Sequence, residues 1–65
     1  MRIELNGEPL DTAATTLAAL LTERGVAGDG VATALDGRFV PRPQRQCTPL
    51  RDGARVEVLA PMQGG

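Results

Sequence analysis

The residues with the clearest chemical potential are the last two of the sequence, Gly64 and Gly65. Glycine has no side chain, so a carboxylate on a pair of glycines is unhindered and can enter a narrow channel in another protein. An α-carboxylate has a pKa of about 3.5 and is ionised at neutral pH, so it resists nucleophilic attack until it is activated. The pair predicts that the carboxylate of Gly65 is itself the reactive group, although a frayed terminus would also explain it.

The side chains offer no competing catalytic set. The sequence contains no histidine, so the commonest general base and metal ligand is missing. Its single cysteine, Cys47, has no histidine to activate it and no disulfide partner, which indicates an incidental cysteine and a reducing compartment. Asp36 and Asp52 stand in turn sequences, where aspartate bonds the backbone. We therefore predict no catalytic residue, no metal and no bound cofactor.

Charge and hydropathy argue against other classes of function. Eight acidic residues against seven arginines give a net charge of −1, which provides no basic surface for nucleic acid. The absence of lysine means that the chain cannot accept an isopeptide bond on a lysine of its own. No stretch approaches the length of a membrane span, and residues 1–5 lack the apolar core of a signal peptide. We expect a cytoplasmic protein that binds neither nucleic acid nor membrane and is a monomer by itself.

The first third of the sequence predicts a hairpin followed by a helix. Residues 2–6 alternate between polar and apolar, and Asn6-Gly7 is a strong hairpin signal, so residues 8–11 should return as a second strand. Thr15 or Thr16 can cap a helix that Gly25 ends. The apolar stripe of that helix, with spacing i, i+3 and i+4, consists of Leu17, Leu20 and Leu21.

The second half predicts three further strands. Residues 31–35 and 38–40 flank Asp36-Gly37, a second hairpin signal. Residues 42–48 show no clear periodicity. Residues 55–59 alternate and are rich in valine, with Leu59 on the face away from the core.

This order of elements predicts an α+β fold. It corresponds to the β-grasp, or ubiquitin-like, arrangement: a mixed sheet of about five strands with one helix on one face. The last strand should lie centrally and parallel to the first. We expect residues 1–60 to form the domain and residues 61–65 to form a flexible tail ending in Gly-Gly.

Several stretches match a known family over nearly the whole length. They are the helix at residues 16–21, the run at 31–37, Val40-Pro41-Arg42, the turn at 50–53 before Val56-Glu57-Val58, and Gly64-Gly65. Through them the chain resembles the ThiS family of sulfur carriers in thiamine biosynthesis. It departs from the common pattern of that family at Asp36, near Arg45, and at Ala54 and Gln63.

The resemblance implies a mechanism and a set of partners. A ThiF-like adenylyltransferase would use ATP to join the carboxylate of Gly65 to AMP. A sulfur donor protein would then displace AMP and leave a thiocarboxylate, whose sulfur would pass to a ThiG-like thiazole synthase. The chain would be a carrier and not an enzyme, with Met62, Gln63 and Gly64 presenting the reactive end.

Docking residues are predicted from exposure. Leu59 and Phe39 are candidates for a patch that a partner covers, together with Arg42. Arg38, Arg42 and Arg45 could form a basic patch for an acidic partner, but such residues more often lie on a solvated face, which we expect here.

Other functions fit some of the same features. The small subunit of molybdopterin synthase shares the fold, the diglycine and the thiocarboxylate, and other diglycine carriers supply sulfur for cysteine or other metabolites. A ubiquitin-like protein modifier would use the same end, whereas a β-grasp regulatory or RNA-associated module would not. The Val40-Pro41-Arg42 segment and the short chain favour the thiazole pathway.

Overall fold

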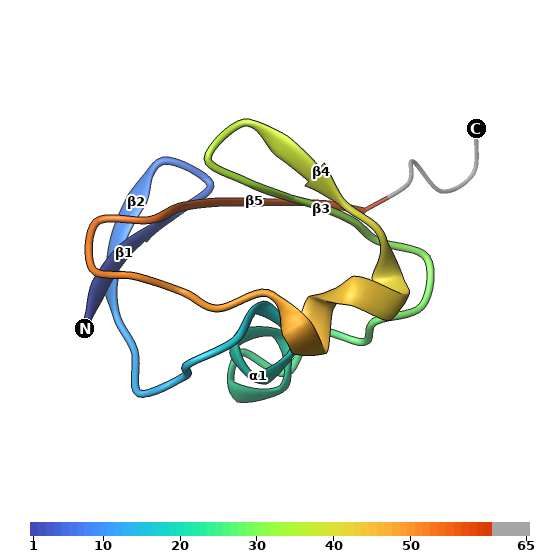
Figure 1. Cartoon of the computed structure of the whole chain (residues 1–65), viewed down its shortest axis with the longest axis horizontal. Coiled ribbons are helices and arrows are strands. Elements are labelled where there is room, and N and C mark those ends of the chain that lie inside the picture. Colours follow the sequence, from blue (N-terminus) through green and yellow to red (C-terminus); the bar gives the residue numbers. More distant parts are fainter. Residues whose placement is uncertain (61–65) are drawn as a thin grey trace.

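The computed structural model describes residues 1–60 of the chain. It consists of a five-stranded sheet that is covered on one face by a helix (Figure 1). The elements are β1 (Arg2–Leu5), β2 (Glu8–Asp11), α1 (Leu17–Glu23), β3 (Ala32–Leu35), β4 (Arg38–Val40), the 3-10 helix η1 (Arg42–Cys47) and β5 (Arg55–Leu59). The strands lie in the order β2-β1-β5-β3-β4. The last strand is central, parallel to β1 and antiparallel to β3, which confirms the predicted β-grasp.

Both hairpins turn as their sequences predict. Asn6 and Gly7 have φ values of 51° and 84°, and Asp36 and Gly37 have values of 50° and 83°. Two successive residues with positive φ are typical of a type I′ turn, whose twist matches that of the strands it joins. The turns thereby set the register of β1 against β2 and of β3 against β4.

Helix α1 packs its leucine stripe against the sheet. Thr16 caps its first turn, because the hydroxyl oxygen accepts a hydrogen bond from the backbone N–H of Ala19 at 3.1 Å. Leu17 and Leu20 are fully buried, and Leu21 is 5% exposed. Leu17 and Leu20 belong to a core cluster that also contains Ile3, Ala14, Val40, Leu50, Ala54 and Val56. The predicted stripe is therefore confirmed as core.

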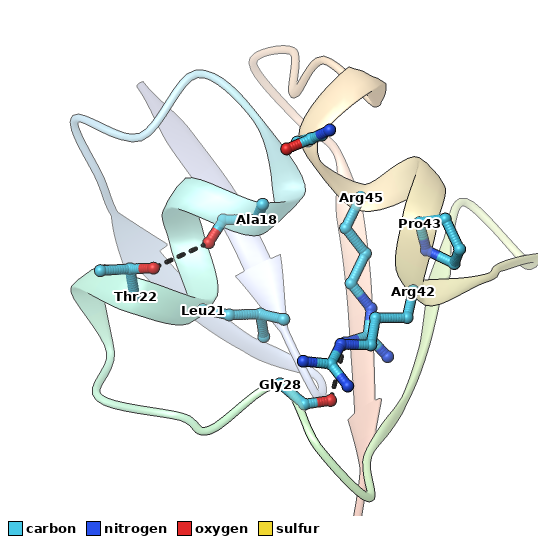
Figure 2. A pocket seen from close by; sticks show the side chains of 8 residues that line it. Ala18, Leu21, Thr22, Gly28, Arg42, Pro43 and Arg45 are labelled. Atoms are coloured by element: carbon cyan, nitrogen blue, oxygen red, sulfur yellow. Dashed lines mark hydrogen bonds between the residues drawn. The ribbon is translucent and has the colours of Figure 1, made fainter.

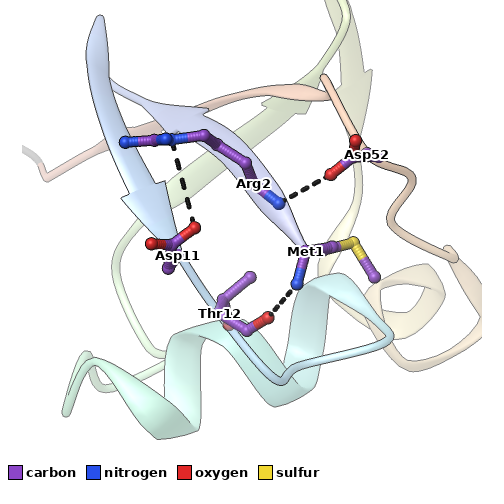
Figure 3. Close-up of polar contacts among 5 residues, drawn as sticks. All are labelled: Met1, Arg2, Asp11, Thr12 and Asp52. Carbon is purple, nitrogen blue, oxygen red and sulfur yellow. Dashed lines mark hydrogen bonds and ion pairs between the residues drawn. The ribbon is translucent and has the colours of Figure 1, made fainter.

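Backbone and side-chain bonds fix the first residues at one end of the sheet (Figure 3). The Met1 ammonium donates to the carbonyl of Thr12 at 2.9 Å. The N–H of Arg2 donates to Oδ1 of Asp52 at 2.7 Å, which confirms Asp52 as a turn residue that bonds the backbone. The Arg2 side chain also pairs with Asp11 at 4.0 Å. The start of β1 is thus tied both to β2 and to the turn before β5.

The segment without periodicity is ordered as η1, which lies beside α1 (Figure 1). Pro41 precedes this 3-10 helix and Pro43 stands in its first turn, where a proline costs no hydrogen bond. A 3-10 helix of two turns has no room to develop a 3.6-residue pattern, which is why the sequence alone gave no signal. No helix formed by residues 1–60 is long and apolar enough to cross a bilayer.

Candidate functional site

The predicted reactive end continues from the central strand of the sheet. Met62, Gln63, Gly64 and Gly65 lie outside the described residues, so their roles stay predictions. The strand that leads to them, β5, is held between β1 and β3 and ends at Leu59. The six residues that follow Leu59 can span at most about 20 Å. Any partner that acts on Gly65 must therefore bind close to the end of β5.

An apolar patch lies on the outer face of the sheet, next to that strand end. We define the outer-face patch as Ala32, Ala34, Phe39 and Leu59. Phe39 is 69% exposed and Leu59 67% exposed, which confirms the outward orientation predicted for Leu59. In the register, Ala32 is opposite Leu59 and Ala34 is opposite Phe39. The two small alanine side chains leave a hollow of about 110 Å³ between the two large ones, with Glu57 at its margin.

The other half of the outer face is charged. Glu4 of β1 is the register partner of Arg55 at the start of β5, and both are exposed. Arg2 and Asp11 form the pair noted above on the same side of the sheet. The outer face therefore divides into a charged half over β1 and β2 and an apolar half over β3, β4 and the end of β5. The apolar half adjoins the point where the chain leaves the sheet.

Arg42 lies apart from this patch, on the helix side of the sheet. It lines a hollow of about 430 Å³ between α1 and η1, together with Ala18 and Thr22 of the helix (Figure 2). Its guanidinium forms an ion pair with Asp29. The structure thus brings together Leu59 and Phe39 of the three predicted docking residues, and places Arg42 elsewhere.

Arg45 contradicts the prediction of a solvated arginine face, whereas Arg38 and Arg42 are exposed as expected. The residue surface of Arg45 is only 4% exposed, and three guanidinium nitrogens donate to neutral oxygens. Nε donates to Oγ1 of Thr33 at 3.0 Å, Nη1 to the carbonyl of Gly28 at 3.0 Å, and Nη2 to the carbonyl of Val31 at 2.7 Å. Figure 2 shows the bond to Gly28 across the hollow. Arg45 therefore fastens the loop before β3, and each of its three guanidinium nitrogens makes a hydrogen bond within the chain.

Cys47 is exposed at the end of η1. Among residues 1–60, no three histidine, cysteine or acidic residues gather in an arrangement that could hold a metal ion. The sequence contains no histidine that could activate Cys47, and its incidental role stays a prediction.

Comparison of the chain with known proteins identifies its family. The family model of ThiS matches residues 2–65. The chain belongs to the ThiS family. A curated relative, the sulfur carrier protein ThiS of Thermus thermophilus, is 46% identical over 61 residues, which cover 94% of this chain and 95% of the relative.

Solved structures agree with the fold of this ThiS-family chain. The crystal structure of the thiamine biosynthesis protein ThiS from Geobacter metallireducens superposes with a TM-score of 0.84 at 30% identity, and all of both chains is covered. An NMR solution structure of a thiamine biosynthesis protein from the same organism gives a TM-score of 0.81 at 33% identity, covering 100% of this chain and 88% of the other. Together they confirm the β-grasp assignment.

In this ThiS-family chain, Asn6 forms side-chain hydrogen bonds near the end of β5. The sequence predicts Asn6 only as a turn residue, yet its side chain forms two hydrogen bonds with Val58. The two residues are 52 positions apart, so no local sequence signal could have paired them.

Proposed function

We propose that this ThiS-family chain is a sulfur carrier of thiamine biosynthesis that works through the carboxylate of Gly65 and supplies no catalytic side chain. The observation that carries the proposal is the family match over residues 2–65, which includes the Gly64-Gly65 pair. The apolar outer-face patch beside the strand that leads to this pair supports it. The carrier acts in the cytoplasm, where its enzymes activate and use it.

The proposed chemistry follows from the low reactivity of a carboxylate. A ThiF-like adenylyltransferase binds ATP, and the carboxylate oxygen of Gly65 attacks the α-phosphorus, so that pyrophosphate leaves. The resulting acyl adenylate carries AMP, a good leaving group. A sulfide equivalent from a donor protein attacks the carbonyl carbon and expels AMP, which leaves a thiocarboxylate. A ThiG-like thiazole synthase then takes the sulfur.

The proposed docking surface for these partners is the outer-face patch. Exposed aromatic and large aliphatic side chains are the residues that protein interfaces most often bury at their centre. A partner seated on Phe39 and Leu59 covers the end of β5, which places the following residues within reach of its active site. Arg42 keeps its proposed docking role only for a partner that also reaches the helix side of the sheet.

Sulfur loading of three chains tests the proposed role of Gly65. Wild type, a chain lacking Gly65 and a chain with one alanine added after Gly65 are incubated with a ThiF-like enzyme, ATP and a sulfide source. Removing one residue shifts the carboxylate by about 3.5 Å, which is as large as the distance of about 3–3.5 Å required between reacting atoms. We expect intact-mass measurement to detect replacement of oxygen by sulfur in wild type alone.

Circular dichroism provides the control for that experiment, because the packed core lies within residues 1–60 and all three chains should fold alike. Equal sulfur loading of the shortened or extended chain would overturn the proposal for Gly65.

Variants of the sheet surface test the docking proposal separately. Phe39→Ser and Leu59→Ser each remove an exposed apolar side chain, and Glu4→Ser on the charged half of the same face is the matched control. A central interface residue contributes at least about 1 kcal/mol, so we expect KM for the carrier to rise about five- to tenfold in the two patch variants. An unchanged KM in both would exclude the patch as the docking surface.

A further inference from the structure

On the side that faces β1, the end of β5 bonds to a side chain, because β1 ends before it reaches Val58. Along the parallel pair, the N–H of Glu4 donates to the carbonyl of Ala54 and the N–H of Asn6 donates to the carbonyl of Val56, each at 2.8 Å. The next bonds in this series would join the N–H of Val58 to the backbone carbonyl of Asn6, and the carbonyl of Val58 to the N–H of residue 8. By then β1 has turned away into its hairpin and residue 8 pairs with Leu5 instead. The N–H of residue 8 is therefore not available to the carbonyl of Val58, and the N–H of Val58 bonds the side chain of Asn6 in place of its backbone carbonyl.

The side-chain amide of Asn6 fills this position. Its Oδ1 accepts a hydrogen bond from the N–H of Val58 at 2.9 Å, and its Nδ2 donates to the carbonyl of Val58 at 3.2 Å. A carboxamide offers the same donor and acceptor as a peptide group, so it can extend a ladder by one step. The φ of 51° at Asn6 belongs to the type I′ turn, a backbone conformation that asparagine tolerates better than most residues.

The second hairpin provides an internal comparison at the other end of β5. Asp36 occupies the equivalent turn position with φ of 50°, and its Oδ1 accepts a hydrogen bond from the N–H of Arg55 at 2.9 Å. An ionised carboxylate can only accept, so aspartate suffices for one N–H. Val58 presents both its N–H and its carbonyl to the side chain of residue 6. Bonding both groups requires an acceptor and a donor, and asparagine provides both. Each turn thus bonds a different end of the same central strand.

We propose that Asn6 is a positioning residue for sulfur loading: its bonds to Val58 hold the last residues of β5 in the sheet and so set the point from which the reactive arm extends. This inference rests on the proposed function of Gly65. Without the two bonds, Val58 and Leu59 are held only by their pairing with β3. Where that pairing opens, residues 58–60 join the arm, which lengthens from five residues to eight. The local concentration of a tethered group falls roughly as the −3/2 power of the length of its tether, which corresponds to a loss of about twofold. Displacement of Leu59 from the outer-face patch adds to that loss.

The test compares glycine variants of the two turn residues. Asn6→Gly keeps a residue that accepts positive φ and removes both side-chain bonds to Val58. Asp36→Gly removes the one side-chain bond to Arg55 at the far end of the strand and leaves the backbone bond from the N–H of residue 36 to the Arg55 carbonyl. Asn6→Asp keeps the turn and an acceptor but places a carboxylate beside the Val58 carbonyl. The two glycine variants therefore each remove the side chain of a turn residue, at opposite ends of β5.

Amide hydrogen exchange of the full-length protein gives the first readout. We expect the N–H of Val58 to exchange about tenfold faster in Asn6→Gly, while the N–H of Val56 in the middle of the strand is unchanged. Unchanged exchange at Val58, or an equal increase at both amides, would contradict a local role for Asn6. This readout does not depend on sulfur chemistry, so it tests the bonds even if Gly65 is never loaded.

Steady-state sulfur loading by a ThiF-like enzyme gives the second readout. We expect KM for Asn6→Gly to be higher than that of wild type by about twofold, with kcat nearly unchanged, and Asp36→Gly to match wild type. KM for Asn6→Asp should be close to that for Asn6→Gly, because aspartate lacks the N–H that donates to the Val58 carbonyl. Equal kinetic parameters for the two glycine variants would overturn the proposal, whereas failure of wild type to accept sulfur would instead refute the proposed function.

Discussion

Replacing Arg45 by lysine should destabilise the protein far more than the conservative chemistry suggests. The guanidinium of Arg45 bonds Thr33, Gly28 and Val31 from three different nitrogens. An ammonium carries its three donors on one nitrogen at the end of a flexible stem, so it cannot reproduce the planar set of directions of a guanidinium. We expect Arg45→Lys to keep at most one of the three bonds.

The size of the effect follows from the number of bonds lost. A hydrogen bond to a charged group contributes about 1.5–3 kcal/mol, and the carbonyls of the loop can recover part of that from water. We therefore expect a loss of about 3 kcal/mol in the free energy of unfolding. A domain of 65 residues has a total stability of about 3–10 kcal/mol, so the loss is a large fraction of the whole.

Urea unfolding followed by circular dichroism measures this loss. With a slope of about 1 kcal/mol per molar urea, the midpoint of Arg45→Lys should fall by about 2–3 M. Arg42→Lys is the matched control on the same 3-10 helix, because the side chain of Arg42 is 66% exposed and an exposed ion pair contributes less than about 1 kcal/mol. Equal midpoints for the two lysine variants would refute the argument that burial and geometry make Arg45 structural.

Three further substitutions test the core, the helix cap and the cysteine. Leu20→Ala should lower the free energy of unfolding by about 2–5 kcal/mol, because Leu20 is fully buried. A melting temperature equal to that of wild type would contradict the assignment of Leu20 to the core. Thr16→Ala should cost about 1 kcal/mol through loss of the bond to the N–H of Ala19, measured by the same unfolding, and an unchanged midpoint would contradict its capping role. Cys47→Ser should accept sulfur on its terminus as wild type does, measured by intact mass, whereas a folded variant that is not loaded would assign Cys47 a part in the chemistry.

The sequence by itself determined the features that depend on neighbours along the chain. The two turn dipeptides, the leucine stripe of α1 and the alternation of β5 each follow from conformational preferences or side-chain periodicity within a few residues. Their order was sufficient to predict the β-grasp and the central place of β5. The diglycine was visible from its residue types alone, and its chemistry stays a prediction.

Only the tertiary structure decided which side chains meet across the sheet and beneath it. Asn6 contacts Val58 across 52 positions because β1 and β5 are parallel neighbours in a particular register. Ala34 of β3 joins Phe39 and Leu59 in one patch because β4 and β5 flank β3 on either side. Arg45 is buried because η1 folds over the sheet beside α1, and its three acceptors come from a different part of the chain. Periodicity reports which face of an element is apolar, but contacts between elements depend on register and packing, which are properties of the assembled fold.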